Sequence, residues 1–143
     1  MNALEFRDIR FSHDDRKSCL EDLSFSLEEG ISSVLLGPNG AGKSTIMALA
    51  LGYLKPSGGE ILLFGKPLES YNRKVLGSLV GYVSQSGGVS FNYSVIDYVL
   101  LGRASRISPL GTPGAADRRA AREAIETAGI GFLAERKVLE LSA

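Results

Sequence analysis

A glycine-rich loop that carries one lysine and two hydroxyl side chains is the part of this sequence best suited to chemistry. The loop consists of Gly37, Pro38, Asn39, Gly40, Ala41, Gly42, Lys43, Ser44 and Thr45. It fits the spacing of a phosphate-binding loop, in which glycine lets backbone N–H groups approach phosphate oxygens closely. A helix that follows directs its positive end at the same anion. The pattern therefore predicts a site for a nucleoside triphosphate.

Two side chains of this loop have roles that depend on their place in it. We expect Lys43 to reach the β- and γ-phosphates, and the Ser44 hydroxyl to complete the ligand shell of Mg²⁺. Apolar residues 31–36 predict a buried parallel strand before the loop. Residues 46–51 predict a helix after it that ends at Gly52. A turn that merely packs tightly is the alternative, but the elements on either side favour phosphate binding.

Length, charge and cysteine content narrow the class of protein. The 143 residues carry 16 basic and 16 acidic side chains, so no charge excess indicates nucleic acid or an anionic membrane surface as a partner. No apolar run approaches the length of a membrane span, and the N-terminus lacks a signal peptide. The single cysteine, Cys19, is typical of a reducing cytosol, and we expect it to be a small buried hydrophobic residue. The sequence indicates a soluble, intracellular α/β polypeptide.

The first thirty residues or so predict an antiparallel strand pair that leads to the phosphate loop. Leu4 and Phe6 share one face of the first strand, whereas Ile9 and Phe11 fall on the other. A bulge near residues 7–8 would reconcile the two pairs, because one extra residue reverses the alternation.

The remaining elements are predicted from periodicity and capping. They are strands over residues 60–64 and 79–83, and helices over 72–76, 95–101 and 115–128. Ser94, with Asp97 three residues later, resembles a capping box that opens the helix at residue 95. We expect the charged side chains of the last helix to form a solvated face. These side chains are Arg118, Arg119, Arg122 and Glu126.

Taken in order, these features resemble the ATP-binding subunits of ABC transporters from the first residues to the last. The matching stretches are GPNGAGKST, LKPSGGEILLFGKPL, VGYVSQ and the terminal LSA. The phosphate loop alone occurs in many nucleotide enzymes, but a glutamine after a strand about forty residues later makes the pattern quite specific. The stretch SVIDYVLLGR is similar to the importer branch that handles iron chelates, haem and cobalamin.

The resemblance implies a fold class and a domain organisation. The fold would be α/β, a P-loop NTPase core with an N-terminal antiparallel β subdomain over residues 1–85 and the start of a helical subdomain over 86–143. In the family, the Mg²⁺-linked aspartate, the catalytic glutamate and the switch histidine follow the signature that begins at LSA. The resemblance therefore implies that residues 1–143 are the N-terminal part of a longer protein and cannot hydrolyse ATP by themselves. It also implies that the missing strands lie between and beside those present.

The resemblance also gives roles to particular residues. Thr45 would contact the α-phosphate, and Gln85 matches the glutamine that contacts Mg²⁺ or the attacking water. Ser142 matches the signature serine. In the family's dimers, this serine faces the γ-phosphate of the ATP that is bound to the second ATP-binding subunit. The aromatic residue that stacks on adenine in the family aligns with His13, and Phe11 lies two residues earlier. Two readings stay open: stacking on the base, or a core role for Phe11 and a solvated loop position for His13.

Partners and location follow from the same resemblance. Val89, Phe91 and Tyr93 lie where the family grips a helix of its transmembrane permease, although a role in the core of the helical lobe is equally open. The protein would be cytoplasmic and peripheral on the inner face of the cell membrane, with ATP and Mg²⁺ as cofactors. The alternatives are a soluble ABC-type ATPase without a membrane partner and a nucleotide-binding module without hydrolysis.

Overall fold

The computed structural model describes residues 1–14, 17–84, 91–108 and 110–141, and it leaves the side chains of residues 13–18 undescribed. The chain divides into two compact units, Met1–Asn72 and Arg73–Ala143, which are considered separately below. The subdomain boundary predicted at residue 85 falls outside the described residues, and it stays a prediction.

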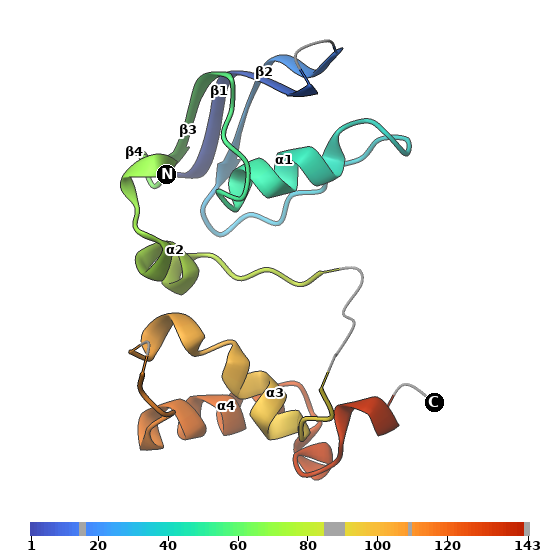
Figure 1. Ribbon diagram of the computed structural model, residues 1–143, viewed down its shortest axis with the longest axis vertical. Coiled ribbons are helices and arrows are strands. Elements are labelled where there is room, and N and C mark those ends of the chain that lie inside the picture. Colours follow the sequence, from blue (N-terminus) through green and yellow to red (C-terminus); the bar gives the residue numbers. More distant parts are fainter. Residues whose placement is uncertain (15–16, 85–90, 109, 142–143) are drawn as a thin grey trace. The chain divides into compact units, whose positions relative to one another are not determined.

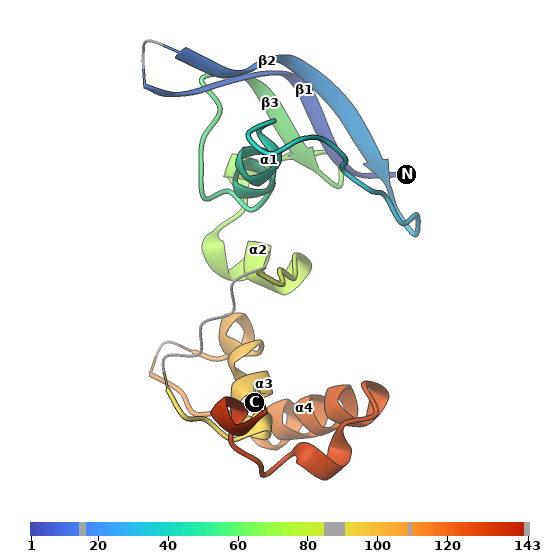
Figure 2. The ribbon, with the colours of Figure 1, turned by 90° about the vertical axis from the view of Figure 1, so that its right-hand side faces the viewer.

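The first unit is built on an antiparallel sheet. Its strands are β1 (Asn2–Asp14), β2 (Lys17–Glu28), β3 (Gly58–Leu63) and β4 (Lys66–Pro67), in the order β2-β1-β3-β4 (Figures 1 and 2). β1 is central because it pairs with β2 on one side and with β3 on the other. A short 3₁₀ turn, η1 (Leu68–Ser70), follows β4. The buried apolar side chains of this unit are Phe6, Ile9, Phe11, Leu20, Ile46, Leu49, Ile61, Leu62, Leu63 and Leu68.

The predicted bulge in the first strand is confirmed. The register of β1 against β2 shifts between Phe6 and Ile9, and Asp8 has a φ of 49°. The Ser24 hydroxyl accepts the Asp8 backbone N–H at 2.8 Å and donates to Asp8 Oδ1 at 3.0 Å. Because the extra residue reverses the alternation, Phe6, Ile9 and Phe11 are all buried.

The helix after the phosphate loop is α1 (Lys43–Ala50), which lies beside the sheet (Figure 1). Ile46 and Leu49 are buried, so the helix packs with its apolar side against the core. The chain leaves the helix at Gly52, whose φ of 66° is left-handed, as the sequence predicts.

The second unit is helical in its described part. It contains α2 (Arg73–Leu79), α3 (Val95–Leu101) and α4 (Ala115–Thr127), with 3₁₀ turns η2 (Ala104–Arg106), η3 (Gly131–Leu133) and η4 (Val138–Glu140). The helices predicted over 72–76, 95–101 and 115–128 are thus present, with small shifts at their ends. No helix within the described ranges is both long and apolar enough to span a bilayer.

Polar contacts fix the ends of α3 and α4. Ser94 caps α3: its Oγ accepts the Asp97 N–H at 3.2 Å and donates to the Asp97 carboxylate at 2.6 Å, as the capping pattern predicts. At the start of α4, Asp117 accepts the Gly114 N–H and the Arg103 guanidinium, both at 3.1 Å. These contacts lower the pKa of Asp117, and the hydrogen bond from the Gly114 N–H has a larger effect than the one from Arg103. The pair with Arg103 therefore ties the end of α3 to the beginning of α4.

Two of the predicted strands do not form, and the expectation is wrong for both. Residues 31–36 run as irregular chain, with 79% of Val34 and 84% of Leu36 exposed. Residues 80–84 are also irregular, and Val83 is 94% exposed. A parallel strand is stable only where neighbouring strands take up its N–H and C=O groups, and no described strand flanks either run. Apolar composition alone therefore does not make these segments strands.

Candidate functional site

The phosphate loop passes into α1 through a glycine in the left-handed region. Gly42 is the N-cap of α1 with a φ of 84°, and its carbonyl accepts the Ile46 N–H at 2.9 Å. No side chain caps the helix, and its first turn contains no acidic residue. The first N–H groups of the helix are therefore free to bind an anion, and the helix dipole favours negative charge at this point.

Gly42 is also confined by a neighbouring strand. A Cβ on this glycine would lie 3.0 Å from Leu20 Cδ2, which is tighter than ordinary packing, and the positive φ would strain any other residue. The loop therefore needs glycine here both for its turn and for its contact with β2.

Lys43 is the cation of the site, and it is bound to the loop itself. Its Nζ donates to the backbone carbonyls of Gly37 and Pro38, at 2.6 Å each. Ala41 N–H donates to the Pro38 carbonyl at 3.3 Å, so the loop closes on itself around the ammonium. Residues 37–41 are exposed, which leaves the loop open to a ligand from solvent.

The two hydroxyl residues of the loop lie in different environments. Ser44 is exposed, and its hydroxyl is an oxygen donor of the kind Mg²⁺ prefers, so it fits a metal bound together with phosphate. Thr45 is only 8% exposed, and its Oγ1 lies 3.7 Å from Cys19 Sγ, at hydrogen-bonding distance for sulfur. Ser44 is therefore open to solvent, whereas Thr45 is held against the sheet.

Other predicted site residues are only partly described. Gln85 and Ser142 lie outside the described residues, so their roles stay predictions. The backbone of His13 belongs to β1, but its side chain is not described. Phe11 is 7% exposed and packs in the core, which favours the structural role over stacking on a base. Asn39 and Gly40 form the exposed turn of the loop.

Cys19 corrects a prediction from the sequence. The sequence predicts a buried side chain, but Cys19 is exposed and lies against the phosphate loop. Together with Leu20 it forms the support behind Gly42 and Thr45, which sequence reasoning missed. No local signal could have found this contact, because it joins residues more than twenty positions apart through the fold of β2.

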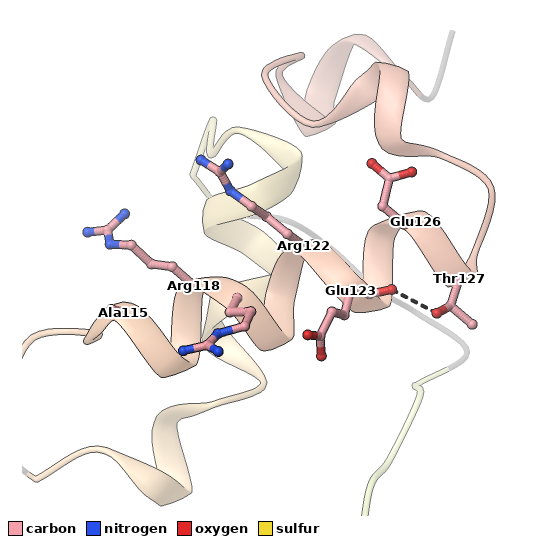
Figure 3. A pocket seen from close by; sticks show the side chains of 7 residues that line it. Ala115, Arg118, Arg122, Glu123, Glu126 and Thr127 are labelled. Carbon is pink, nitrogen blue, oxygen red and sulfur yellow. Dashed lines mark hydrogen bonds between the residues drawn. The ribbon is translucent and has the colours of Figure 1, made fainter.

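A hollow of about 690 Å³ lies in the second unit, on one face of α4 (Figure 3). It is lined by Ala115, Arg118, Arg119, Arg122, Glu123, Glu126 and Thr127. All belong to a single helix, and Thr127 merely caps back onto the Glu123 carbonyl at 2.7 Å. The charged side chains are exposed, as expected for a solvated face, with the three arginines before the two glutamates along the helix. The site that the sequence predicts is the loop at α1 rather than this hollow.

Comparison with known proteins places this geometry in a family. The ABC transporter family matches residues 20–143, and the chain belongs to it. It is 36% identical to the zinc transport system ATP-binding protein TroB of Treponema pallidum, over 98% of this chain and 51% of that protein. It is also 36% identical to the manganese transport system ATP-binding protein MntB of Bacillus subtilis, over 89% of this chain and 50% of that protein. The chain spans about half the length of these curated relatives.

Solved structures agree with this assignment. A metal-chelate type ABC transporter in an inward-facing conformation matches with a TM-score of 0.78 and 30% identity, over 96% of this chain and 49% of that one. CbiO1 of Clostridium perfringens, part of the ABC transporter complex cbiONQ, matches with a TM-score of 0.78 and 28% identity, over 95% and 54%. The fold is therefore that of an ABC nucleotide-binding domain, with its antiparallel β subdomain and helical part present.

Proposed function

We propose that this chain is the ATP-binding part of a subunit that couples ATP binding and hydrolysis to the import of a metal ion or metal chelate. The observation that carries the proposal is the uncapped start of α1, where Gly42 turns the loop and Lys43 follows directly. The names of the relatives, which are zinc and manganese transport proteins, support the import of metal. Iron chelates, haem and cobalamin are the cargo classes favoured by the stretch SVIDYVLLGR.

Binding would proceed by replacement of contacts within the loop. Phosphate oxygens would take over the Lys43 ammonium from the Gly37 and Pro38 carbonyls, and the free N–H groups of α1 would bind the same anion. Ser44 would supply a hydroxyl ligand to Mg²⁺, which neutralises charge on the β- and γ-phosphates when bound. Gln85 would complete this arrangement.

The test of nucleotide binding is the variant Lys43→Ala. It removes a charge-assisted contact to phosphate worth about 1.5–3 kcal/mol, so the affinity for ATP·Mg²⁺ should fall about ten- to hundredfold. Isothermal titration calorimetry measures the dissociation constant directly. The matched control is Lys66→Ala, which removes an exposed lysine of the β4 strand and should leave affinity unchanged. Equal affinity in the parent and in Lys43→Ala would overturn the assignment.

Hydrolysis is proposed only for a protein that contains more than these 143 residues. The residue that orients the attacking water in the family follows the signature at Ser142, so these residues alone should release phosphate negligibly. In the dimer, Ser142 of one subunit would act on the nucleotide of a second ATP-binding subunit. Steady phosphate release from the isolated 143 residues, abolished by Lys43→Ala, would contradict this view.

We place the docking surface for a transmembrane permease at residues 87–93, which would hold the protein at the inner face of the cell membrane. Within the described part, Phe91 is 67% exposed and its ring lies 5.8 Å from that of Tyr93, centroid to centroid, with a tilt of 57°. An exposed aromatic pair offers apolar area to an incoming helix. This exposure supports a docking role for Phe91 over a core role.

The variant Phe91→Asp tests this surface. A charge in an apolar contact is costly when it finds neither water nor a partner, so transport should be abolished while ATP affinity remains nearly intact. Transport and nucleotide titration should be measured on the same full-length variant. The control is Phe132→Asp, at a side chain that is 81% exposed in η3 and lies outside the proposed surface. Normal transport by Phe91→Asp would place the surface elsewhere, and loss of both activities would mark Phe91 as a folding residue.

A further inference from the structure

The thiol of Cys19 reaches α1 because β2 is bulged at this residue. Phe11 and Ser12 are consecutive in β1, but they pair with Leu20 and Ser18, so Cys19 is the extra residue of β2. A bulge changes the direction of a side chain relative to the regular alternation of the strand. Bulges next to active sites commonly aim a side chain at a functional group.

Cys19 and its neighbour Leu20 lie against the end of the phosphate loop. Cys19 Sγ lies 3.7 Å from Thr45 Oγ1, and either atom could be the donor. The space beside Gly42 is closed by Leu20 Cδ2 at 3.0 Å, with the Cys19 carbonyl and Sγ at 3.8 and 3.9 Å from where a Cβ would stand. Thr45 and Leu20 are each 8% exposed, whereas Cys19 is exposed, so the contact lies at the edge of the buried region. The strand thus supports the last glycine of the loop and the first turn of α1.

We propose that Cys19 is a positioning residue for nucleotide binding, which acts through the hydroxyl of Thr45. This inference rests on the proposed function, because Thr45 matters to it only as a contact of the α-phosphate. A threonine hydroxyl has one proton and rotates freely, so its direction depends on its partners. When the thiol donates to Thr45 Oγ1, the hydroxyl proton remains available for a phosphate oxygen, which is a far stronger acceptor than sulfur. Cys19 thereby fixes the hydroxyl in the direction in which it can donate to the nucleotide.

A packing role and a positioning role of Cys19 predict different ATP affinities for two substitutions at this residue. Cys19→Ser keeps a donor next to Thr45, whereas Cys19→Val keeps the bulk and loses the donor. If Cys19 positions the hydroxyl, ATP affinity in Cys19→Ser stays within about twofold of the parent, and it falls about fivefold in Cys19→Val, the size of one ordinary hydrogen bond. If Cys19 only fills space, Cys19→Val binds ATP as well as the parent does, which would overturn the proposal.

The variant Thr45→Val provides the matched background, because it removes the hydroxyl through which Cys19 acts. In this background, Cys19→Ser and Cys19→Val should bind ATP equally. A double-mutant cycle gives this result when the effect of residue 19 depends on the hydroxyl of residue 45. A difference of fivefold that persists in Thr45→Val would overturn the proposal. Thermal unfolding of each variant shows whether it is folded, and Cys19→Ser keeps the test valid if Cys19→Val is not.

The experiment separates this inference from the proposed function. ATP·Mg²⁺ that binds to the parent protein but not to Lys43→Ala supports the phosphate site, whatever the Cys19 variants do. Failure of the parent to bind ATP removes the proposed function and the inference with it. Binding by the parent, with no effect of Cys19→Val, removes only the inference.

Discussion

The two units of the chain are nearly equal in length, but different interactions stabilise each of them internally. Of the fourteen buried apolar side chains among the described residues, ten lie in Met1–Asn72 and four in Arg73–Ala143. In the first unit, the stacked rings of Phe6 and Phe25, 4.6 Å apart, lie on paired strands. In the second, the ends of the helices depend on Ser94 and Asp117. The first unit should therefore respond most to lost apolar contacts, and the second to lost polar ones.

The largest effect is expected from Phe6→Ala in the first unit. Phe6 is 1% exposed, and removal of a buried phenylalanine side chain typically costs about 3–5 kcal/mol of unfolding free energy. Denaturation followed by circular dichroism measures this loss.

The control for Phe6→Ala lies in the same unit. Leu36 is 84% exposed in the irregular run 31–36, so Leu36→Ala should change the unfolding free energy by less than about 0.5 kcal/mol. A cost in Leu36→Ala as large as in Phe6→Ala would show that this run is packed, and the contrast between sheet and run would be lost.

A smaller, pH-dependent effect is expected in the second unit. The folded state lowers the pKa of Asp117, so its stabilising contribution is complete above the ordinary aspartate pKa and is lost as the pH falls through the folded value. Thermal unfolding between about pH 3 and pH 7 should show this acid loss in the parent and less of it in Asp117→Asn. Glu123→Gln, at an exposed carboxylate of α4, is the control. An identical acid profile in Asp117→Asn and the parent would contradict the role of this pair.

Local chemistry made part of the fold predictable. The bulge near Asp8 follows from the reversed alternation of apolar residues in β1, and the start of α3 follows from Ser94 and Asp97. Both depend on residues close in sequence, where pattern and capping decide the structure. The position of the phosphate loop before α1 is predictable for the same reason.

The remainder required the tertiary structure. Residues 31–36 have the composition of a buried strand, but a strand needs partners, and composition does not say whether they are present. The exposure of Cys19 and its contact with Thr45 depend on a bulge and on how α1 packs against β2. In the candidate site, Lys43 was predictable from its motif, whereas the carbonyls that hold it were not.

The ammonium of Lys43 has consequences for ligand selection. Because it already donates to two carbonyls, a ligand that offered only neutral oxygens would exchange one set of hydrogen bonds for an equivalent set. A polyphosphate offers charged oxygens, which add the attraction between unlike charges to the hydrogen bonds of the ammonium. We therefore expect the loop to bind polyphosphates in preference to neutral or weakly charged solutes.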